Sequence, residues 1–187
     1  MLQVLALAVT AVVTIGPSHR LSTPVSHGRL AEPEITYLME APERRIRAFS
    51  PQLQQGVADG LRRSPTFAAI VRALQESDII VQIVDALHLP PSLHARLTLA
   101  NGDRTFRFVR IEVGYYRRGD ELIALLGHEL QHALELALAP DVRSEAGMAA
   151  LYKRIGFRTR GDRHFDTHEA HAAERRIRRE LAQARPS

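Results

Sequence analysis

Two histidines and a glutamate stand within five consecutive residues, His128-Glu129-Leu130-Gln131-His132. Histidines four positions apart on a helix lie one turn apart on the same face, so two imidazole nitrogens can point at one metal ion. Glu129 lies next to His128, within reach of a water held by that ion. This order of residues predicts zinc-dependent hydrolysis of peptide bonds. The zinc ion (Zn2+) activates the water, and Glu129 passes the proton of that water to the leaving amine.

The segment that must position these residues is apolar on nearly every side from Glu121 to Ala139. Such a pattern predicts a helix buried in the middle of a domain. We expect Asp120 to cap its start and Pro140 to end it. Polar side chains inside such a helix need partners, because an unpaired buried imidazole is costly. Core hydrogen bonds to the two histidines are the alternative to a metal site.

The motif helix resembles that of the zincin metallopeptidases, and residues 128–135 also resemble a group of small, mostly uncharacterised bacterial proteins. The resemblance implies an α+β, zincin-like fold with a small sheet, a buried central motif helix and C-terminal helices. It also implies a peptide or protein substrate lying along an edge strand just before that helix, for which Thr105 to Val113 is the counterpart. Metzincins continue the motif with Gly and a third His; here Glu135 and Leu138 occupy those positions, which excludes that group.

Gluzincins take their third ligand from a later helix, and this implies a ligand between Phe165 and Glu174. Asp166 opens the last predicted helix and resembles an acidic residue followed by Thr in the small bacterial relatives. Glu169, followed three residues later by a small residue, resembles the gluzincin pattern and is the alternative third ligand. His168 and His171 also carry nitrogens that suit zinc. For Glu174 and His168 we favour an exposed position on the helix surface.

Other residues near the motif have two interpretations each. Glu135 lies one turn after His132 and could orient a ligand histidine, or it could pair with Arg143 on the surface. Tyr115 and Tyr116 could donate a hydrogen bond to an oxyanion, although ordinary packing is favoured. Gly127 would allow close packing of the motif helix against a strand.

The remaining elements follow from periodicity and turn residues. A Ser64 cap followed by Pro65 begins a helix that runs to Gln75. The β-branched run from Ile79 to Val84 predicts a strand. Leu97 and Leu99 are expected to pair with Thr105–Val113 across a turn, forming a hairpin. Further helices are predicted over Ser144–Ile155 and Thr167–Ala184, which gives an α+β organisation.

The composition excludes several classes of site. The chain has 187 residues and no cysteine, so a disulfide framework, a thiolate nucleophile and a cysteine zinc finger are all excluded. The net charge of +4 is spread along the chain, and aromatic residues amount to 5% with no Trp. We therefore expect no nucleic-acid partner, and interpret Arg175–Arg179 as a solvated helix face.

The first residues form a separate region. Leu2 to Ile15 is almost wholly apolar, which fits the core of a signal peptide or a buried N-terminal strand or helix. We expect a leader over 1–16, a linker over 17–34 and a zincin-like metallopeptidase domain over 35–187. With the leader, the protein would be exported to the periplasm or secreted, and would meet a membrane only through that leader. Without it, the protein would be cytoplasmic.

Two functional hypotheses follow. The first is a zinc peptidase, a hydrolase, with His128 and His132 as metal ligands and Glu129 as the catalytic base. The alternative is a zincin-like domain that uses zinc structurally or binds a partner, without catalysis. Glu129 favours the first hypothesis, because a structural zinc site has no need of a base.

Overall fold

The computed structural model describes residues 44–184, apart from 91–92, 101, 104 and 159–164. The proposed leader and linker lie outside the described residues. Six strands and five helices in this part of the chain make a small α+β fold with a mixed sheet, as predicted. Their order is β1 (Ile46–Ala48), α2 (Pro51–Arg63), α3 (Pro65–Gln75), β2 (Ile79–Ala86), β3 (Ala95–Ala100), β4 (Arg107–Gly114), α4 (Gly119–Ala137), α5 (Glu145–Ile155), β5 (Phe157–Arg158), β6 (Phe165–Asp166) and α6 (His168–Gln183).

Four strands form one sheet in the order β1-β2-β4-β3. Strands β1, β2 and β4 are parallel, whereas β3 is antiparallel to β4, with Leu97 opposite Ile111 and Leu99 opposite Val109. The predicted hairpin is confirmed. The expectation that Thr105–Val113 is an edge strand is wrong, because β2 pairs along its whole length with β4. This pairing makes β4 an interior strand and leaves β3 at the edge.

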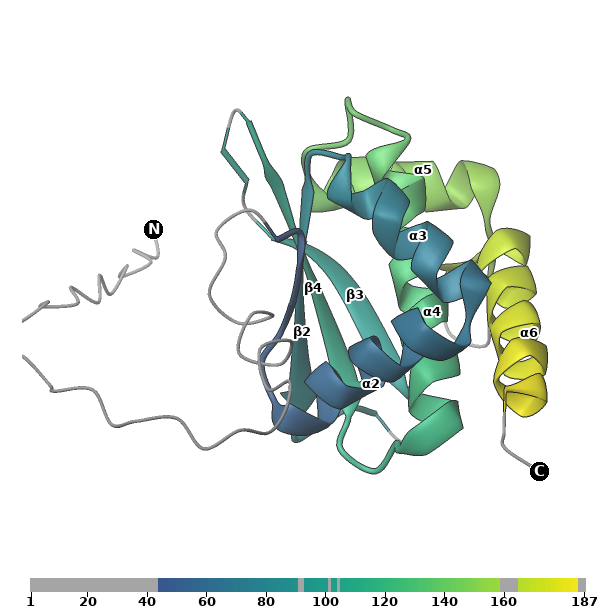
Figure 1. Ribbon diagram of the computed structural model, residues 1–187. Helices are drawn as coiled ribbons and strands as arrows, with labels where there is room; N and C mark the ends of the chain where they lie inside the picture. Colours follow the sequence, from purple (N-terminus) through teal and green to yellow (C-terminus); the bar gives the residue numbers. More distant parts are fainter. Residues whose placement is uncertain (1–43, 91–92, 101, 104, 159–164, 185–187) are drawn as a thin grey trace, which may run out of the picture. The chain divides into compact units, whose positions relative to one another are not determined.

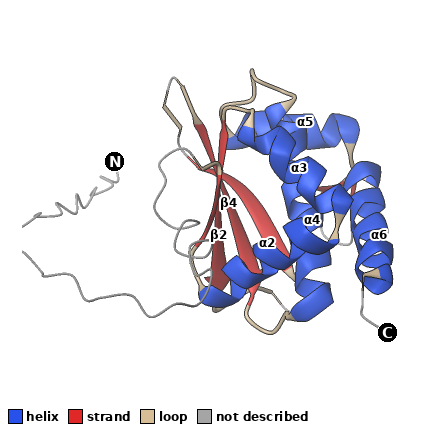
Figure 2. Ribbon diagram, viewed as in Figure 1, coloured by secondary structure: helices blue, strands red, loops and turns tan. Residues whose placement is uncertain are grey.

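The labelled helices lie on one side of this sheet (Figures 1 and 2). Helix α4 packs against α2, α3 and α6, and also against β2 and β3. Alternate side chains of β4, namely Val109, Ile111 and Val113, are buried, while Arg110 between them is exposed. One face of each central strand therefore contributes to the core that surrounds α4.

Helix α4 agrees with the predicted central helix at both ends to within two residues. Its leucines at 122, 126, 130 and 136 are essentially inaccessible, as the continuous apolar pattern predicts. The prediction that Asp120 caps the start of α4 is wrong. Arg118 is the N-cap residue, Gly119 takes a positive φ of 55°, and Asp120 lies in the first turn. The Asp120 carboxylate pairs instead with Arg63 of α2 at 2.8 Å.

The end of α4 is capped by a buried arginine. The Arg107 side chain is 1% exposed, and its Nη1 donates to the carbonyl oxygens of Leu136 and Ala139 at 2.8 Å and of Val142 at 3.1 Å. The last carbonyl groups of a helix lack partners within it and carry partial negative charge. Arg107 therefore satisfies these groups and fixes the end of α4 against the start of β4.

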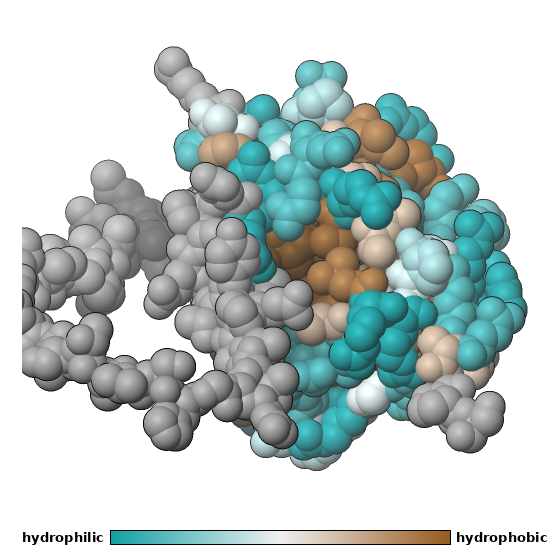
Figure 3. All heavy atoms as spheres, in the orientation of Figure 1, coloured by the Kyte–Doolittle hydropathy of each residue, from teal (hydrophilic) through white to brown (hydrophobic). Residues whose placement is uncertain are grey.

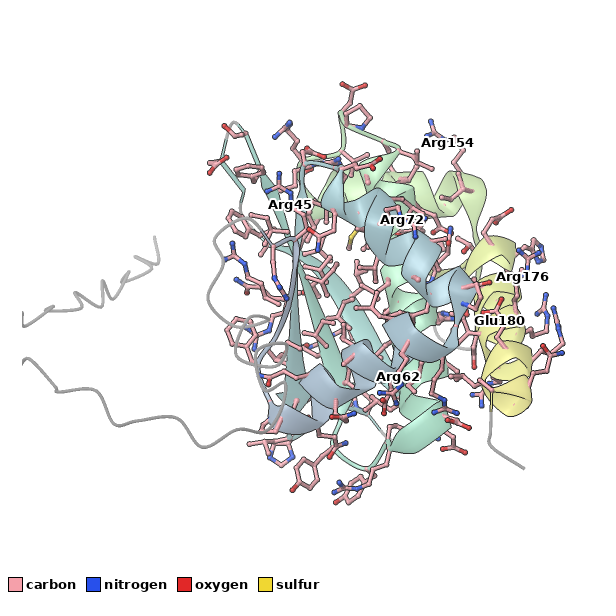
Figure 4. The ribbon with its side chains drawn as sticks, in the orientation of Figure 1. Arg45, Arg62, Arg72, Arg154, Arg176 and Glu180 are labelled. Atoms are coloured by element: carbon pink, nitrogen blue, oxygen red, sulfur yellow. The ribbon has the colours of Figure 1, made fainter. Side chains whose placement is uncertain are left out.

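Hydroxyl side chains cap the other helices. Ser64 accepts a backbone hydrogen bond at the start of α3, as predicted. Ser144 and Thr167 do so at the starts of α5 and α6. Glu180 of α6 accepts from the Ser64 hydroxyl at 2.5 Å and from the Thr66 hydroxyl at 2.6 Å. Figure 4 shows Glu180 on α6 close to the start of α3. A carboxylate at a helix N-terminus is favourable, so Glu180 ties α6 to α3.

The surface of the described helices is largely polar in the view of Figure 3. Arg62, Arg72, Arg154 and Arg176 are exposed on four different helices (Figure 4). Among the described residues, no helix combines the length and apolar character needed to cross a bilayer.

Candidate metal centre

The motif residues lie in the second half of α4 and are buried. His128, Glu129 and His132 are 8%, 7% and 7% exposed, and all three line one cavity. They are polar residues within a helix whose neighbouring turns are filled by leucines. Because buried polar groups need partners, the surroundings of each ring nitrogen decide what the site can do.

Asp166 joins the two histidines from another element. Its Oδ1 lies 3.3 Å from His128 Nε2 and 3.5 Å from His132 Nε2. One ligand atom from each of the three residues lies within 4.8 Å of the others, a spacing that can hold a metal ion. Glu169, the alternative third ligand, is exposed and belongs to neither group of candidate ligands found among the described residues.

The short β5–β6 ladder positions Asp166. Phe157 pairs with Asp166, and the backbone N–H of Thr167 donates to Asp166 Oδ1 at 2.7 Å. Gly156 precedes this ladder, and a Cβ at that position would lie 2.5 Å from the carbonyl oxygen of Asp166. Asp166 therefore lies just before α6, whose cap is Thr167, and the absence of a side chain at Gly156 allows the close approach.

Glu135 supports His132, which settles the choice between its two interpretations. Its Oε2 lies 2.9 Å from His132 Nδ1, and its Oε1 accepts a hydrogen bond from the Thr167 hydroxyl at 2.7 Å. Pairing with Arg143 is wrong, because Arg143 lies near Asp78 and bonds the Asp103 carbonyl. With Nδ1 held by Glu135, the His132 ring presents Nε2 to the candidate centre.

Two α6 residues approach the centre from the other side. His171 Nε2 lies 2.8 Å from Asp166 Oδ2, and Glu174 Oε2 lies 3.2 Å from His128 Nδ1. The expectation that Glu174 is a surface residue is wrong, because it lines the cavity and is only 22% exposed. One turn of helix separates it from His171, and periodicity alone gave no sign that this face turns inward. His168 is exposed, as expected.

Charge interactions within the cluster shift the pKa values of its members. Burial alone would lower the pKa of His128, but contacts with Asp166 and Glu174 outweigh it and raise the pKa to about 10. Burial likewise opposes protonation of His132, yet Asp166 and Glu135 raise its pKa to about 9. Burial disfavours the ionised form of Asp166, but the two histidines hold its pKa well below the usual range. Without a metal ion, protons on the histidines balance the carboxylates.

The pKa of Glu129 is shifted upward, in contrast to that of Asp166. Burial raises the pKa of the Glu129 carboxyl, and the nearby His132 and His128 oppose the increase. Burial therefore favours the protonated form of Glu129, and the two histidines favour its ionised form.

The cavity that contains these groups has a volume of about 370 Å³. Edge strand β3 and the residues just before it form one wall, and α5 forms another. The lining also includes apolar side chains from four elements and the segment before β3: Leu93, Leu97, Leu125, Met148 and Phe165.

Tyr115 and Tyr116 lie outside this cavity. They are 51% and 93% exposed and line a second cavity, at the ends of β2 and β4. The oxyanion contact, the less favoured interpretation of the two tyrosines, therefore finds no support in their positions. Tyr152, which the sequence did not single out, lines the first cavity, and its hydroxyl donates to the carbonyl oxygen of His132 at 2.9 Å.

Gly127 packs against helices rather than against a strand. A Cβ at this position would overlap Ile177 Cδ1 of α6 and would lie 3.5 Å from Phe67 Cδ2 of α3. The expectation of a strand contact is therefore wrong. The small residue lets α6 approach α4 closely, which brings His171 and Glu174 of α6 to the motif.

No family model, curated protein or solved structure matches the chain in the comparisons with known proteins.

Proposed function

We propose that the protein is a zinc-dependent peptidase of zincin-like type, in which His128, His132 and Asp166 bind the metal ion. One observation carries the proposal: the Nε2 atoms of both histidines converge on Asp166 Oδ1 in a cavity that also contains the buried Glu129. Two imidazoles and one carboxylate are a common ligand set of catalytic zinc sites, which leave one position open. The donor set therefore fits zinc.

A bound zinc ion would supply Lewis acidity toward a carbonyl oxygen and would lower the pKa of a water. Glu129, next to His128, is placed to accept the proton of that water and then to donate it to the leaving amine. Glu135 holds the His132 ring through Nδ1, and the Thr167 hydroxyl in turn holds Glu135. These contacts keep the ligand in one orientation during the reaction.

Edge strand β3 supports a peptide as the substrate. It forms a wall of the cavity, and one of its sides has no strand partner in the described part of the chain. An extended peptide can add to such an edge through backbone hydrogen bonds. Leu97, Leu125 and Met148 would then surround an apolar side chain of the substrate. We therefore propose β3, rather than β4, as the substrate strand.

A second candidate function is a zincin-like domain that binds zinc structurally, or binds a partner, without catalysis. It is favoured by a second group of candidate ligands, His128, His171 and Glu174, which shares His128 with the first. A structural zinc site is closed by four protein ligands, and the α6 residues could supply the fourth.

The test begins with bound zinc in the purified wild type and in His132→Ala. Cleavage of casein and of a peptide library is then compared between wild type and Glu129→Gln. We expect zinc in the wild type, little in His132→Ala, and loss of cleavage with zinc retained in Glu129→Gln. A wild type without zinc would overturn both zinc-dependent functions, the peptidase and the structural zinc site. Zinc without cleavage would favour the second.

A matched pair of variants tests the third ligand. Asp166→Ala is expected to lose zinc. Glu169→Ala removes an exposed carboxylate three residues further along the chain and is expected to retain zinc. Retention of zinc by Asp166→Ala would reject this ligand set.

A further inference from the structure

The α6 residues His171 and Glu174 contact the candidate ligands on the side away from the proposed ion. Glu174 Oε2 lies 3.2 Å from His128 Nδ1, while His128 Nε2 faces Asp166. His171 Nε2 lies 2.8 Å from Asp166 Oδ2, while Oδ1 faces the two motif histidines. Each α6 residue therefore contacts the ligand atom that would not bind the ion.

We propose that His171 and Glu174 are positioning residues of this centre. Glu174 directs His128 so that Nε2 binds the ion, and His171 holds Asp166 Oδ2 so that the carboxylate binds through Oδ1 alone. The inference rests on the proposed zinc site and adds a supporting layer contributed by one turn of α6.

His128 carries the first part of this inference. Its Nδ1 is inaccessible to solvent, and the contact with Glu174 does not meet the geometry of a hydrogen bond. A buried N–H without a partner is costly, and in the described part of the chain the Glu174 carboxylate is the ionic partner within 4 Å of Nδ1. Metal-binding histidines commonly donate their second nitrogen to a carboxylate in this way.

The surroundings of both α6 residues hold them in place. Arg178, one turn further along α6, donates to Glu174 Oε1 through Nη2 at 2.9 Å and through Nε at 3.1 Å. The Glu174 carboxylate therefore directs its other oxygen at His128. The His171 ring stacks on Phe157, with centroids 5.8 Å apart and planes 17° apart. Phe157 pairs with Asp166 in the β5–β6 ladder, so one ladder aligns both partners of the His171–Asp166 contact.

A second ion between His128, His171 and Glu174 is the competing interpretation of the same cluster. Two features favour positioning. The 2.8 Å contact with Asp166 already occupies His171 Nε2, and a neutral imidazole such as His128 has one free electron pair for a metal. The number of zinc ions bound per chain distinguishes the two interpretations.

Helix α6 also provides matched controls. Glu169 and His168 are exposed residues of the same types on the same helix. Zinc affinity is measured by competition with a chromophoric chelator for Glu174→Gln, Glu174→Ala, His171→Asn, Glu169→Gln and His168→Asn. Zinc stoichiometry, the absorption spectrum of the cobalt-substituted protein and the urea unfolding of the metal-free protein are recorded for each variant.

We expect one zinc ion per wild-type chain. Glu174→Gln and His171→Asn should each lower zinc affinity by about 10- to 100-fold, the usual effect of losing an outer partner of a ligand. Glu174→Ala should lower it further, because Gln keeps an acceptor for Nδ1–H. The controls should retain wild-type affinity, and the His171→Asn cobalt spectrum should change as Asp166 is released. A cooperative urea unfolding transition in each metal-free variant would show that the variant still folds.

Three results would overturn the inference. Affinities of Glu174→Gln and His171→Asn equal to those of the controls would reject positioning while leaving the zinc peptidase intact. Two ions in the wild type, with one lost in these variants, would make the residues ligands instead. A wild type without zinc would reject the proposed function together with the inference.

Discussion

Arg107 and Asp78 form a two-pronged ion pair at the start of the central strand. Nη2 lies 2.6 Å from Asp78 Oδ1 and Nε lies 2.8 Å from Oδ2, while Nη1 caps the end of α4. Only an arginine has enough donors in a fixed plane to make both sets of contacts. This pair therefore fixes the helix that carries the motif relative to the sheet.

Arg107→Ala should destabilise the protein by about 3 kcal/mol, near the lower end for breaking a buried ion pair, because Asp78 stays partly hydrated. The uncapped carbonyls of Leu136 and Ala139 add to the loss. Urea unfolding measures the change. Arg110→Ala, on the exposed face of the same strand, is the control and should change stability by less than about 0.5 kcal/mol. Equal stabilities of the two variants would contradict the assigned role.

Stability should depend on pH through Asp78. Its hydrogen bonds to Arg107 lower the pKa of Asp78 below the ordinary 3.8, against a smaller opposing effect of burial. A lowered pKa in the folded state means that ionised Asp78 stabilises the protein above pH 3.8, and that this contribution is lost as pH falls through the folded-state value. The gap in unfolding free energy between wild type and Asp78→Asn should therefore narrow on acidification. A gap that widens would reject the ion pair.

Zinc binding should release protons. In the metal-free protein the pKa of His128 is about 10 and that of His132 about 9, so both rings are protonated at neutral pH. Zinc requires neutral imidazoles, and its apparent affinity should therefore rise with pH up to those values. Titration calorimetry in buffers of different ionisation enthalpy should give a release approaching two protons per ion at neutral pH. A binding enthalpy independent of the buffer would contradict the protonated cluster.

Gly127→Ala should destabilise the protein by about 1–3 kcal/mol, the usual cost of overpacking a core. The new methyl group would overlap Ile177 Cδ1 on α6. Ile177→Val removes that Cδ1 atom, so the double variant should be less destabilised than the sum of the two single variants. Thermal or urea unfolding of the wild type, the two single variants and the double variant gives the double-mutant cycle. Simple additivity would mean that the contact with Ile177 does not restrict residue 127.

Local patterns in the sequence predicted most of the elements. The run of leucines predicted α4, serine and proline predicted the start of α3, and a strand on each side of a turn predicted the β3–β4 hairpin. These patterns span only a few residues, so they can be recognised without knowledge of the tertiary structure. The motif histidines were found for the same reason, because their spacing reflects a single helix turn.

What the sequence could not predict depends on contacts between distant segments. Arg107 is one of many arginines, and only the meeting of β4 with the end of α4 gives it a capping role. The exposed position expected for Glu174 is wrong because packing of Ile177 against Gly127 turns this face of α6 toward the motif. The interior position of β4 follows from its pairing with β2, which no pattern within β4 reveals.

Strand β3 has a consequence for the behaviour of the protein at high concentration. Its outer backbone groups, which would receive a peptide, would equally accept a strand from another copy of the chain. Arg96 is an exposed charged residue of this strand, and its Nε donates to Glu112 of β4 at 2.8 Å. Charge on an edge strand discourages aggregation, so solubility and access for a peptide depend on the same row of residues.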